Sequence, residues 1–353
     1  MNFDLTEDRQ MLQDSLRRYL GDKYQIEHRN KVAYAEPFHD PAKWGELTEL
    51  GALFALAPED AGGMGGTGFD ISVVFEELGR VLCPEPVLGA LMASRLMTAA
   101  GADQEALLSG ETRYAVGLGE LDAPYDLSGL STTVKDGKVS GRKSVVYGGQ
   151  AADVFLIAAK DGDSLSVYEV QASDASVTGY AMMDGAGAAE VVLEDAPAKL
   201  LLADADAAIE DAVNAGIVAL CSEAVGAMDV LHKMTVEYLG QRKQFGRPIG
   251  TFQVLQHRAV DMLTEIEQSR SIVIKAAAEL GGPDATRYAS MAKNMIGRAG
   301  RLVAEEAIQM HGGIAMTQEY ELAHIAKRIV MTDHRFGDTD YHLERFIDLS
   351  TAA

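Results

Sequence analysis

Residues 241–250 read QRKQFGRPIG, and residues 309–316 read QMHGGIAM; these two segments decide the fold. The first gathers cations and an aromatic residue directly after a helical pattern, and the second ends another helical pattern in paired glycines. Arginine offers a planar, permanently charged fork that suits phosphate oxygens, and glycine lets backbone approach a ligand without a Cβ in the way. The two segments therefore indicate a ligand site built at the ends of helices.

The chain around these segments has long helical periodicity from residue 207 to the end. Apolar residues recur there at spacings of three and four, which is the signature of helices that bury one face. The first such run contains Ala219, Leu220, Ala224, Met228 and Leu231. We expect a bundle of about four helices in this part of the chain.

The rest of the chain divides into a helical part and a strand-rich part. Residues 1–110 keep helical spacing, whereas about 112–202 consists of short β-rich runs separated by Asp-Gly and Gly-rich turns. This order predicts an α+β protein with an N-terminal α-domain at 1–111, a central β-barrel-like domain at 112–203 and a C-terminal helical-bundle domain at 204–353. Gly63, Gly65 and Gly68 satisfy GxGxxG, but no strand precedes them, so a dinucleotide-binding βαβ unit is rejected.

The charge balance limits the partners of the protein. The 353 residues carry 53 Asp and Glu against 31 Lys and Arg, a formal net charge of −22. A field of that sign repels nucleic-acid backbones and anionic lipid, so nucleic acid is excluded as an expected partner. A polyanionic cofactor or a CoA thioester would need a local cationic patch, and the RKQFGR run is one.

Cysteine usage and hydropathy predict a cytoplasmic protein without a membrane span. Cys83 and Cys221 belong to no metal-spaced cluster, so no metal site is predicted. The N-terminus, MNFDLTEDRQ, lacks the basic and apolar regions of a signal peptide. No apolar run approaches the roughly 18 residues that cross a bilayer.

The two segments and the α, β, α order resemble the acyl-CoA dehydrogenase family over the whole chain. In that family one helix ends in a segment like RKTFG, a Gln follows seven or so residues later, and a later helix ends in a segment like QIFGGNG. The matching residues are Arg242, Lys243, Gln244, Phe245, Gly246, Gln253, Gln309, Met310, His311, Gly312 and Gly313.

The resemblance implies FAD as cofactor and assigns it a set of contacting residues. These are Arg242, Phe245, Gln253, Gln309, Gly312, Gly313 and Thr339. By the resemblance, the motif residues reach the ADP half of an FAD that lies in a neighbouring subunit. The simpler alternative is that Arg242 favours a helix C-terminus electrostatically and that the glycine pair forms an ordinary C-cap turn.

The catalytic base of the family has no counterpart at either of its usual positions. Where the common pattern has glutamate in a segment like YEGTSQIQ, this chain has Gly337. Thr339 stands at the position where the pattern has a flavin-contacting Thr. At the minority position before the RKTFG helix it has Gly216 and Ile217. Because both positions are empty, no catalytic residue is assigned. Asp338, one residue off register, is a possible surrogate base.

Other titratable residues near these positions have simpler explanations. Glu210 and Asp211 fit solvated charges at a helix N-terminus, and His311 and His334 fit structural histidines at helix ends.

The central domain also departs from the family where the flavin ring would bind. Active members carry segments like CVTEPGAGSD and KMWITNGG, whereas this chain has AVGLGELDAPYD and KSVVYGG. Val145 replaces the family's Trp and Tyr147 its Thr. The side that contacts ADP is kept, and the side that contacts the flavin ring is lost.

This asymmetry resembles the small subunit of heteromeric bacterial enzymes such as pimeloyl-CoA dehydrogenase or the steroid side-chain dehydrogenases. The resemblance implies a subunit of an acyl-CoA dehydrogenase that is inactive alone and works in a heterotetramer with a larger chain supplying the glutamate. An electron-transferring flavoprotein is a possible acceptor. Two alternatives stay open: a homomeric flavoenzyme using Asp338, and a non-catalytic scaffold that binds acyl-CoA or protein. The sequence names neither the acyl-CoA, the partner nor the electron acceptor.

Overall fold

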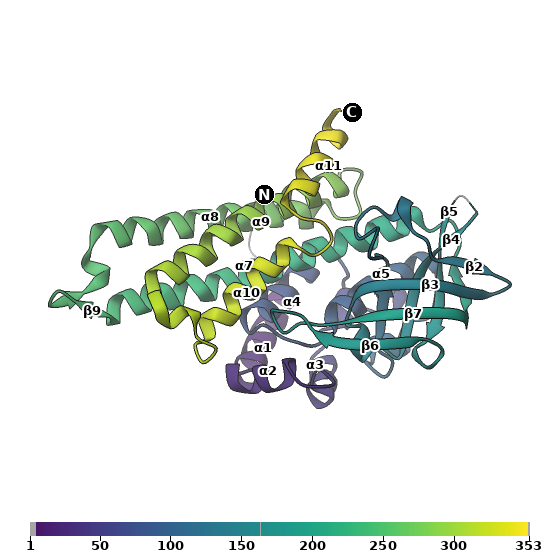
Figure 1. Ribbon diagram of the computed structural model, residues 1–353, viewed down its shortest axis with the longest axis horizontal. Coiled ribbons are helices and arrows are strands. Elements are labelled where there is room, and N and C mark those ends of the chain that lie inside the picture. The colour runs from purple at the N-terminus through teal and green to yellow at the C-terminus, as the bar shows by residue number, and fades with distance from the viewer. Residues whose placement is uncertain (1–4, 163, 352–353) are drawn as a thin grey trace. The chain divides into compact units, whose positions relative to one another are not determined.

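The computed structural model describes residues 5–162 and 164–351, and its elements follow the predicted order of helices, strands and helices (Figure 1). The α+β fold class is confirmed. Two compact units divide the chain: residues 1–74 with 83–216, and residues 75–82 with 217–353. The three predicted domains, 1–111, 112–203 and 204–353, stay a prediction about boundaries, because the α-domain and the sheet fall into one unit.

Short helices form the N-terminal part, and local capping sets where they begin. Thr6 accepts the backbone N–H of Arg9 at the first helix, and Asp40 accepts those of Ala42 and Lys43 at the third, which has Pro41 at its first turn. The helices are α1 (Glu7–Lys23), α2 (Ile26–Ala33), α3 (Pro41–Glu49), α4 (Gly68–Arg80), α5 (Val87–Ala100) and α6 (Glu105–Leu108).

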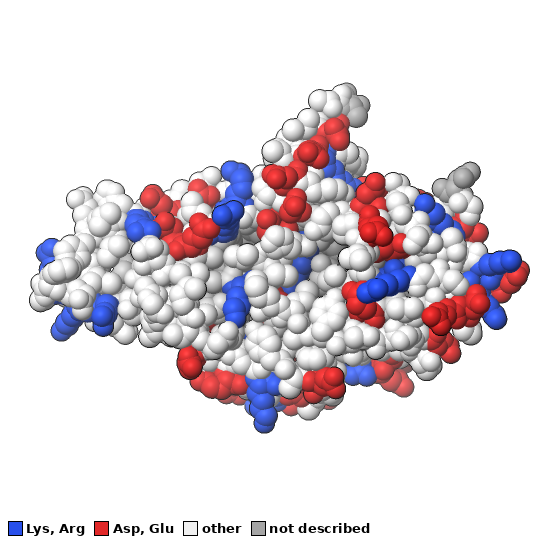
Figure 2. Space-filling model, viewed as in Figure 1, with Lys and Arg blue, Asp and Glu red and all other residues white. Residues whose placement is uncertain are grey.

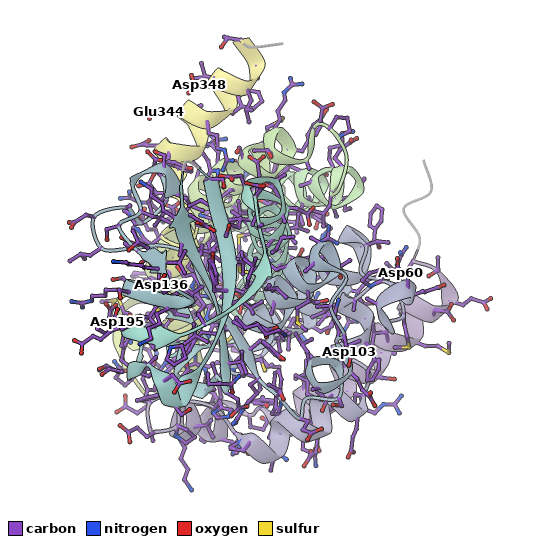
Figure 3. The ribbon with its side chains drawn as sticks, turned by 90° about the vertical axis from the view of Figure 1, so that its right-hand side faces the viewer. Asp60, Asp103, Asp136, Asp195, Glu344 and Asp348 are labelled. Carbon is purple, nitrogen blue, oxygen red and sulfur yellow. The ribbon has the colours of Figure 1, made fainter. Side chains whose placement is uncertain are left out.

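The central part is a mixed sheet in the order β6-β7-β3-β2-β4-β5-β8, with β1 pairing β4 in parallel. Its strands are β1 (Tyr114–Gly117), β2 (Thr133–Lys135), β3 (Lys138–Tyr147), β4 (Val154–Asp161), β5 (Ser164–Gln171), β6 (Ser176–Ala181), β7 (Gly187–Pro197) and β8 (Lys199–Leu202). Alternate residues such as Val139, Phe155, Ile157 and Val191 are fully buried in one core, as the two-residue period of a strand requires. Figure 3 shows Asp136 and Asp195 at one end of this sheet.

Long helices form the C-terminal part, with a two-stranded hairpin between the first two. They are α7 (Asp206–Gln241), β9 (Lys243–Gln244), β10 (Arg247–Pro248), α8 (Gln253–Glu279), α9 (Ala285–His311), α10 (Glu321–Asp333) and α11 (Thr339–Thr351). Among the described residues, α7 is long and apolar enough to cross a membrane by length and composition alone. However, 83% of its apolar window is buried inside the protein, as in a core helix. Location in the cytoplasm stays a prediction.

The last turns of α4 belong to the second unit because two glycines let α4 and α7 approach closely. A Cβ added to Gly79 would lie 2.0 Å from the carbonyl oxygen of Glu223, and one added to Gly226 would lie 2.1 Å from that of Glu76. Asp229 then accepts hydrogen bonds from Arg80 and Arg270, which ties α4 and α8 to α7. Any larger residue at either glycine would force these helices apart.

Glu85 is a buried carboxyl group in the first unit. Its Oε1 accepts the hydroxyl of Tyr24 at 2.8 Å and the backbone N–H of Asp40 at 3.1 Å. Its Oε2 has no hydrogen-bond partner among the described residues. Burial raises the pKa of Glu85 to about 8, against the two hydrogen bonds that lower it. The folded protein therefore holds this carboxyl group protonated at neutral pH.

We expect the stability of the Glu85→Gln variant to depend less on pH than the stability of the wild type. Because the folded pKa lies above the unfolded one, stability from this group is complete below the unfolded value and is lost as pH rises through about 8. One proton corresponds to about 1.4 kcal/mol per pH unit between the two pKa values. Melting temperatures from pH 5 to 8.5 should fall more steeply for wild type than for Glu85→Gln. Parallel curves would show that Glu85 is ionised in the folded protein.

Candidate cofactor site

The β9–β10 hairpin presents a cluster of cations and an exposed aromatic ring. Arg242 follows the last residue of α7, and its backbone N–H donates to Tyr238. Phe245 is 90% exposed and has a φ of +53°, a backbone conformation that bulky residues adopt only where the local structure imposes it. Arg247 stacks over the ring of Phe252, 4.2 Å from its centroid. Figure 2 shows the cationic side chains over this hairpin, at the left edge of the view.

The C-terminal end of α9 lies beside the end of α7 from which the hairpin extends. The rings of Tyr238 and His311 stack with centroids 4.3 Å apart, and the Tyr238 hydroxyl donates to the His311 carbonyl oxygen. Burial lowers the pKa of His311, in keeping with a structural rather than a catalytic histidine. Gly312 follows with a φ of +72°. This stacking brings the two sequence segments that define the site together.

The surface around these helix ends is open enough for a flat, anionic ligand. A Cβ added to Gly246, Gly312 or Gly313 would meet no atom within 4 Å, and both Gln253 and Gln309 are exposed. Exposed cations, an exposed ring, two amides and unobstructed glycine backbone are the groups that bind a phosphate-linked aromatic base. The residues present therefore fit the ADP half of FAD.

Thr339 lies far from the other predicted residues. A Cβ on Gly297 would lie 2.2 Å from its hydroxyl, and Gly297 precedes Gln309 by twelve residues, about 18 Å along α9. The Thr339 hydroxyl donates to the carboxylate of Asp333 at 2.8 Å. Thr339 is thus held at the start of α11 by a contact within the protein.

The loop that contains the expected base position is fixed from three sides. The side chain of Lys293, fully buried in α9, donates to the carbonyl oxygens of Asp333 and Gly337 at 3.0 and 2.6 Å. Its cation therefore meets the last carbonyl of α10, where the helix dipole favours positive charge. Burial lowers the pKa of Lys293 to about 8. Asn294 adds a hydrogen bond to the Thr339 carbonyl oxygen.

His342 holds the other side of the loop as a neutral imidazole. Burial and then the neighbouring Lys293 cation lower the pKa of His342 to about 4. Its Nε2 donates to the carbonyl oxygen of Phe336 at 2.9 Å, which leaves Nδ1 to accept the Ser290 hydroxyl at 3.2 Å.

Gly337 has a backbone conformation and surroundings that exclude a side chain. Its φ is +104°, and an added Cβ would lie 2.3 Å from Cδ1 of Tyr341 and 2.8 Å from Nε2 of His342. A glutamate at this position would therefore require the loop to change course. Gly337 is therefore a turn residue that this loop requires, and not only a position that lacks a carboxylate.

The alternative carboxylates are engaged in structural contacts. Asp338 accepts the backbone N–H of Tyr341 at 2.9 Å and so caps the N-terminus of α11. Asp211 is paired with Arg95 at 2.7 Å. Gly216 is buried within α7.

In the first unit, β3 forms a bulge at the segment that the resemblance compares with a ring-binding strand. Val145 has a φ of +52° and is 42% exposed, beside a register shift between Lys143 and Val146. The carboxylate of Glu190 accepts hydrogen bonds from the Val145 N–H, the Ser144 hydroxyl and the Arg142 guanidinium. The sequence did not single out Glu190, because its bonding partners lie on a different strand.

A second carboxylate missed from the sequence is Glu120. It accepts the hydroxyls of Ser131 and Thr132 and the ammonium of the fully buried Lys143, the last at 3.0 Å. Burial opposes ionisation, but these hydrogen bonds outweigh it and lower the pKa of Glu120 to about 2. A lysine on the inward face of β3 was the available signal, since a buried cation needs a partner.

Comparison with known proteins identifies relatives over nearly the whole chain. Residues 6–105 match the model of the acyl-CoA dehydrogenase N-terminal domain, and residues 207–347 match that of the acyl-CoA dehydrogenase C-terminal domain. The acyl-CoA dehydrogenase IpdE2 of Mycolicibacterium smegmatis is 29% identical over 325 residues, which cover 92% of this chain and 93% of IpdE2.

Two solved structures share the fold closely. A chain of a variant of the Tcur3481-Tcur3483 steroid ACAD superimposes with a TM-score of 0.90 at 27% identity, covering 98% of each chain. A chain of the ChsE4-ChsE5 complex from Mycobacterium tuberculosis gives a TM-score of 0.90 at 23% identity, covering 100% of this chain and 99% of that one.

We expect Gly337→Ala to destabilise the second unit more than a matched glycine substitution. Gly281 also has positive φ, +80°, but an added Cβ there meets nothing within 4 Å. Gly281→Ala should therefore cost only the backbone strain, about 1 kcal/mol, whereas Gly337→Ala adds a clash and should cost about 3 kcal/mol or more. Denaturant unfolding of both variants measures the difference. Equal losses would mean that the loop tolerates a side chain and that the base position is open.

Proposed function

Because the chain belongs to the acyl-CoA dehydrogenase family, whose members are FAD-dependent oxidoreductases acting on acyl-CoA thioesters, we propose that it is the small subunit of a heteromeric enzyme. In this proposal the chain contributes contacts to the ADP half of FAD. A larger dehydrogenase subunit supplies the flavin-ring pocket and the glutamate that removes the substrate's α-proton. An electron-transferring flavoprotein is the proposed electron acceptor.

The observation that carries the proposal is the contrast between the two ends of α9. At the C-terminal end, Arg242 and Phe245 are exposed and the glycine backbone is unobstructed. At the other end, the base position is a glycine closed in by Tyr341 and His342. A chain with an open phosphate-binding surface and no room for a base can contribute contacts to a shared cofactor but cannot start the reaction alone.

Each exposed residue has a proposed part in holding the cofactor. Arg242 would neutralise the pyrophosphate through charge-assisted hydrogen bonds, and Phe245 would pack on an apolar face of the adenosine. Gln253 and Gln309 would donate and accept hydrogen bonds, and Gly312 and Gly313 would let the backbone approach. FAD, when bound, supplies the hydride acceptor for the β-hydrogen of the acyl-CoA. Thr339, which the resemblance assigns as a flavin contact, donates its hydroxyl to Asp333, so we do not include it among the contacts to the ADP half.

The relatives support a heteromeric assembly. Two structural neighbours, the Tcur3481-Tcur3483 steroid ACAD and the ChsE4-ChsE5 complex, are each named for two different chains. By analogy, the substrate class would be a CoA thioester with a bulky acyl group, such as a steroid side chain.

The isolated chain should carry little FAD and should not dehydrogenate acyl-CoA. The expected base position is Gly337, and Oδ1 of the neighbouring Asp338 accepts the Tyr341 backbone N–H at the start of α11. Flavin absorbance of the purified chain, followed by turnover assays with short, long and steroid acyl-CoA thioesters, measures both properties. Robust turnover that is lost in Asp338→Asn would establish a homomeric enzyme instead.

Arg242→Ala should weaken FAD retention in the complex with a larger subunit by about one to two orders of magnitude. A charge-assisted hydrogen bond contributes roughly 1.5–3 kcal/mol, and each 1.36 kcal/mol is about tenfold. The matched control is Lys233→Ala, which removes an exposed cation from α7 several turns before the hairpin. FAD content of the co-expressed complex is measured together with the melting temperature of each isolated variant. Unchanged FAD content with a lowered melting temperature for Arg242→Ala would show that the arginine only stabilises the end of α7.

A further inference from the structure

The loop between α2 and α3, residues 34–40, covers part of the edge strand β6 in the first unit. The Tyr34 hydroxyl donates to the Met183 carbonyl oxygen, just beyond β6, at 3.3 Å. The ring of Phe38 lies 3.8 Å from the position that a Cβ on Gly179 of β6 would take. Edge strands carry backbone groups that can pair with another chain, and a covering loop is one way to prevent such pairing.

Two anchors hold the C-terminal end of this loop. On one side, Nε2 of the buried His39 accepts a hydrogen bond from the Arg113 guanidinium at 3.1 Å. On the other side, the Asp40 backbone N–H donates to Oε1 of Glu85 at 3.1 Å. The Tyr24 hydroxyl donates to the same oxygen, so Glu85 joins the loop to the end of α1. Both anchors therefore act on the two residues that precede α3.

No permanent cation neutralises the Glu85 anchor. Among residues 5–162 and 164–351, no lysine or arginine forms an ion pair with the Glu85 carboxyl group. The charged group that faces it is the carboxylate of Asp40, which caps α3. The other titratable groups around the anchor are Tyr19, Tyr24, His28, Glu46 and Cys83. An ionised Glu85 would therefore lie beside a second carboxylate, with little water to screen the two charges.

The protonated form of Glu85 fits these surroundings, and the ionised form does not. Oε1 has its two donors, whereas Oε2 is buried without a hydrogen-bond partner among the described residues. A buried oxygen that carries charge and has no donor is far more costly than a neutral one. Separating Asp40 from Glu85 would admit water to both oxygens and remove that cost. Closure of the loop and ionisation of Glu85 therefore oppose each other.

We infer that Glu85 makes the 34–40 loop a clasp that a proton closes: the loop stays over β6 while the carboxyl group is protonated, and loss of the proton favours a local opening. In the open form Asp40 and the first turn of α3 leave Glu85, while the sheet and the C-terminal unit stay folded. This device is independent of the cofactor site and of any partner subunit.

Acid tightens the clasp, and alkali loosens it. In the closed form burial raises the pKa of Glu85 to about 8, whereas in the open form the carboxyl group has its ordinary value. Closure is therefore complete below that ordinary value, and the open fraction rises about tenfold per pH unit as the pH approaches 8. Above about 8 both forms are ionised, and the rise ends.

Hydrogen–deuterium exchange of the full chain, followed by mass spectrometry at pH 5.5, 6.5 and 7.5, measures this opening. The reporters are the backbone amides of Asp40, Ala42 and Lys43, which donate to Glu85 or to the Asp40 side chain. After division by the intrinsic rate at each pH, their exchange in the wild type should rise about tenfold per pH unit. In Glu85→Gln, which keeps an acceptor oxygen but cannot ionise, their exchange should stay within about twofold.

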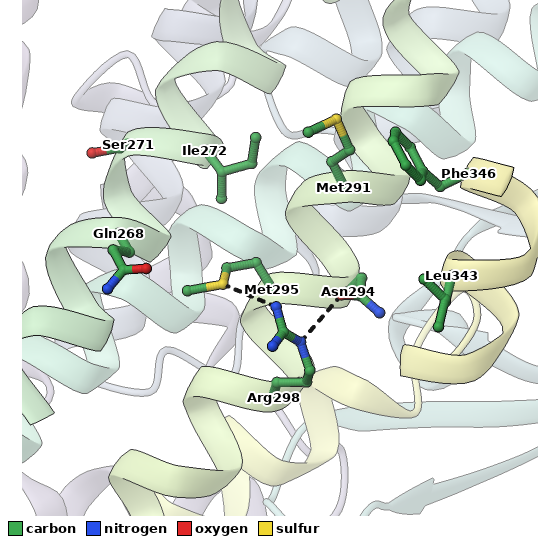
Figure 4. Close-up of a pocket in the computed structure, with 9 residues that line it drawn as sticks. All are labelled: Gln268, Ser271, Ile272, Met291, Asn294, Met295, Arg298, Leu343 and Phe346. Carbon is green, nitrogen blue, oxygen red and sulfur yellow. Dashed lines mark hydrogen bonds between the residues drawn. The ribbon is translucent and has the colours of Figure 1, made fainter. Parts of the chain in front are cut away.

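Two other segments report larger openings. The amides of β4, within the sheet, report unfolding of the first unit. Those of residues 268–272 in α8, beside an apolar pocket of about 570 Å³ between α8, α9 and α11, report the second unit (Figure 4). The loop amides should exchange faster than both segments at every pH. Equal rates in the loop and in β4 would show that the loop opens only with its whole unit, and would overturn the inference.

Two further variants identify the group that titrates. Because imidazole groups also change charge between about pH 5 and 8, and His28 Nε2 lies 3.2 Å from Oδ2 of Asp40, His28→Gln is the matched control. It should keep the pH dependence of the wild type. Loss of that dependence in His28→Gln, together with its persistence in Glu85→Gln, would assign the proton to the histidine and overturn the inference.

Tyr24→Phe removes one of the two hydrogen bonds to Glu85. It should raise exchange of the loop amides roughly fivefold at every pH and leave the dependence on pH unchanged. The wild-type series decides the matter even where a variant fails to fold, because corrected exchange rates that do not rise with pH would refute the clasp.

Discussion

The buried ammonium group of Lys293 is the interaction on which the C-terminal unit depends. It donates to the last carbonyl of α10 and to Gly337, and so fixes where one helix ends and the next can begin. With the loop held there, Gly337 takes positive φ and its side is filled by Tyr341 and His342. A buried cation left without these carbonyls would be strongly destabilising, so the loop and the helices around it are held as one arrangement.

The two ends of α9 differ in structure. The 27 residues of α9 span about 40 Å, which separates the closed base position near its start from the open glycine pair after its end. At the first end, the expected base position is Gly337, where Tyr341 and His342 leave no space for a side chain. Exposed cations on the hairpin at the other end attract a polyanion to a chain whose overall charge repels one. The proposed loss of the base and the proposed retention of cofactor contacts are therefore compatible within one fold.

Local patterns in the sequence predicted the fold class and the helices that end in the two motif segments, because spacing and turn residues are local properties. The closed base position was half predicted. The missing glutamate at Gly337 was visible in the sequence, whereas the hydrogen bond that fixes the loop comes from Lys293, which is distant in the sequence, and the packing of Tyr341 and His342 against Gly337 depends on that folded loop. The same reason hid the Glu120–Lys143 pair and the hold of Glu190 on the Val145 bulge.

The most direct test of the account is an experimental structure of the complex between this chain and a glutamate-bearing larger subunit, with FAD bound. The account predicts the Arg242 guanidinium within hydrogen-bond distance of the FAD pyrophosphate, the flavin ring within the larger subunit, and the partner's carboxylate at the substrate α-carbon. A flavin ring held by this chain, with its own Asp338 facing the substrate, would contradict it.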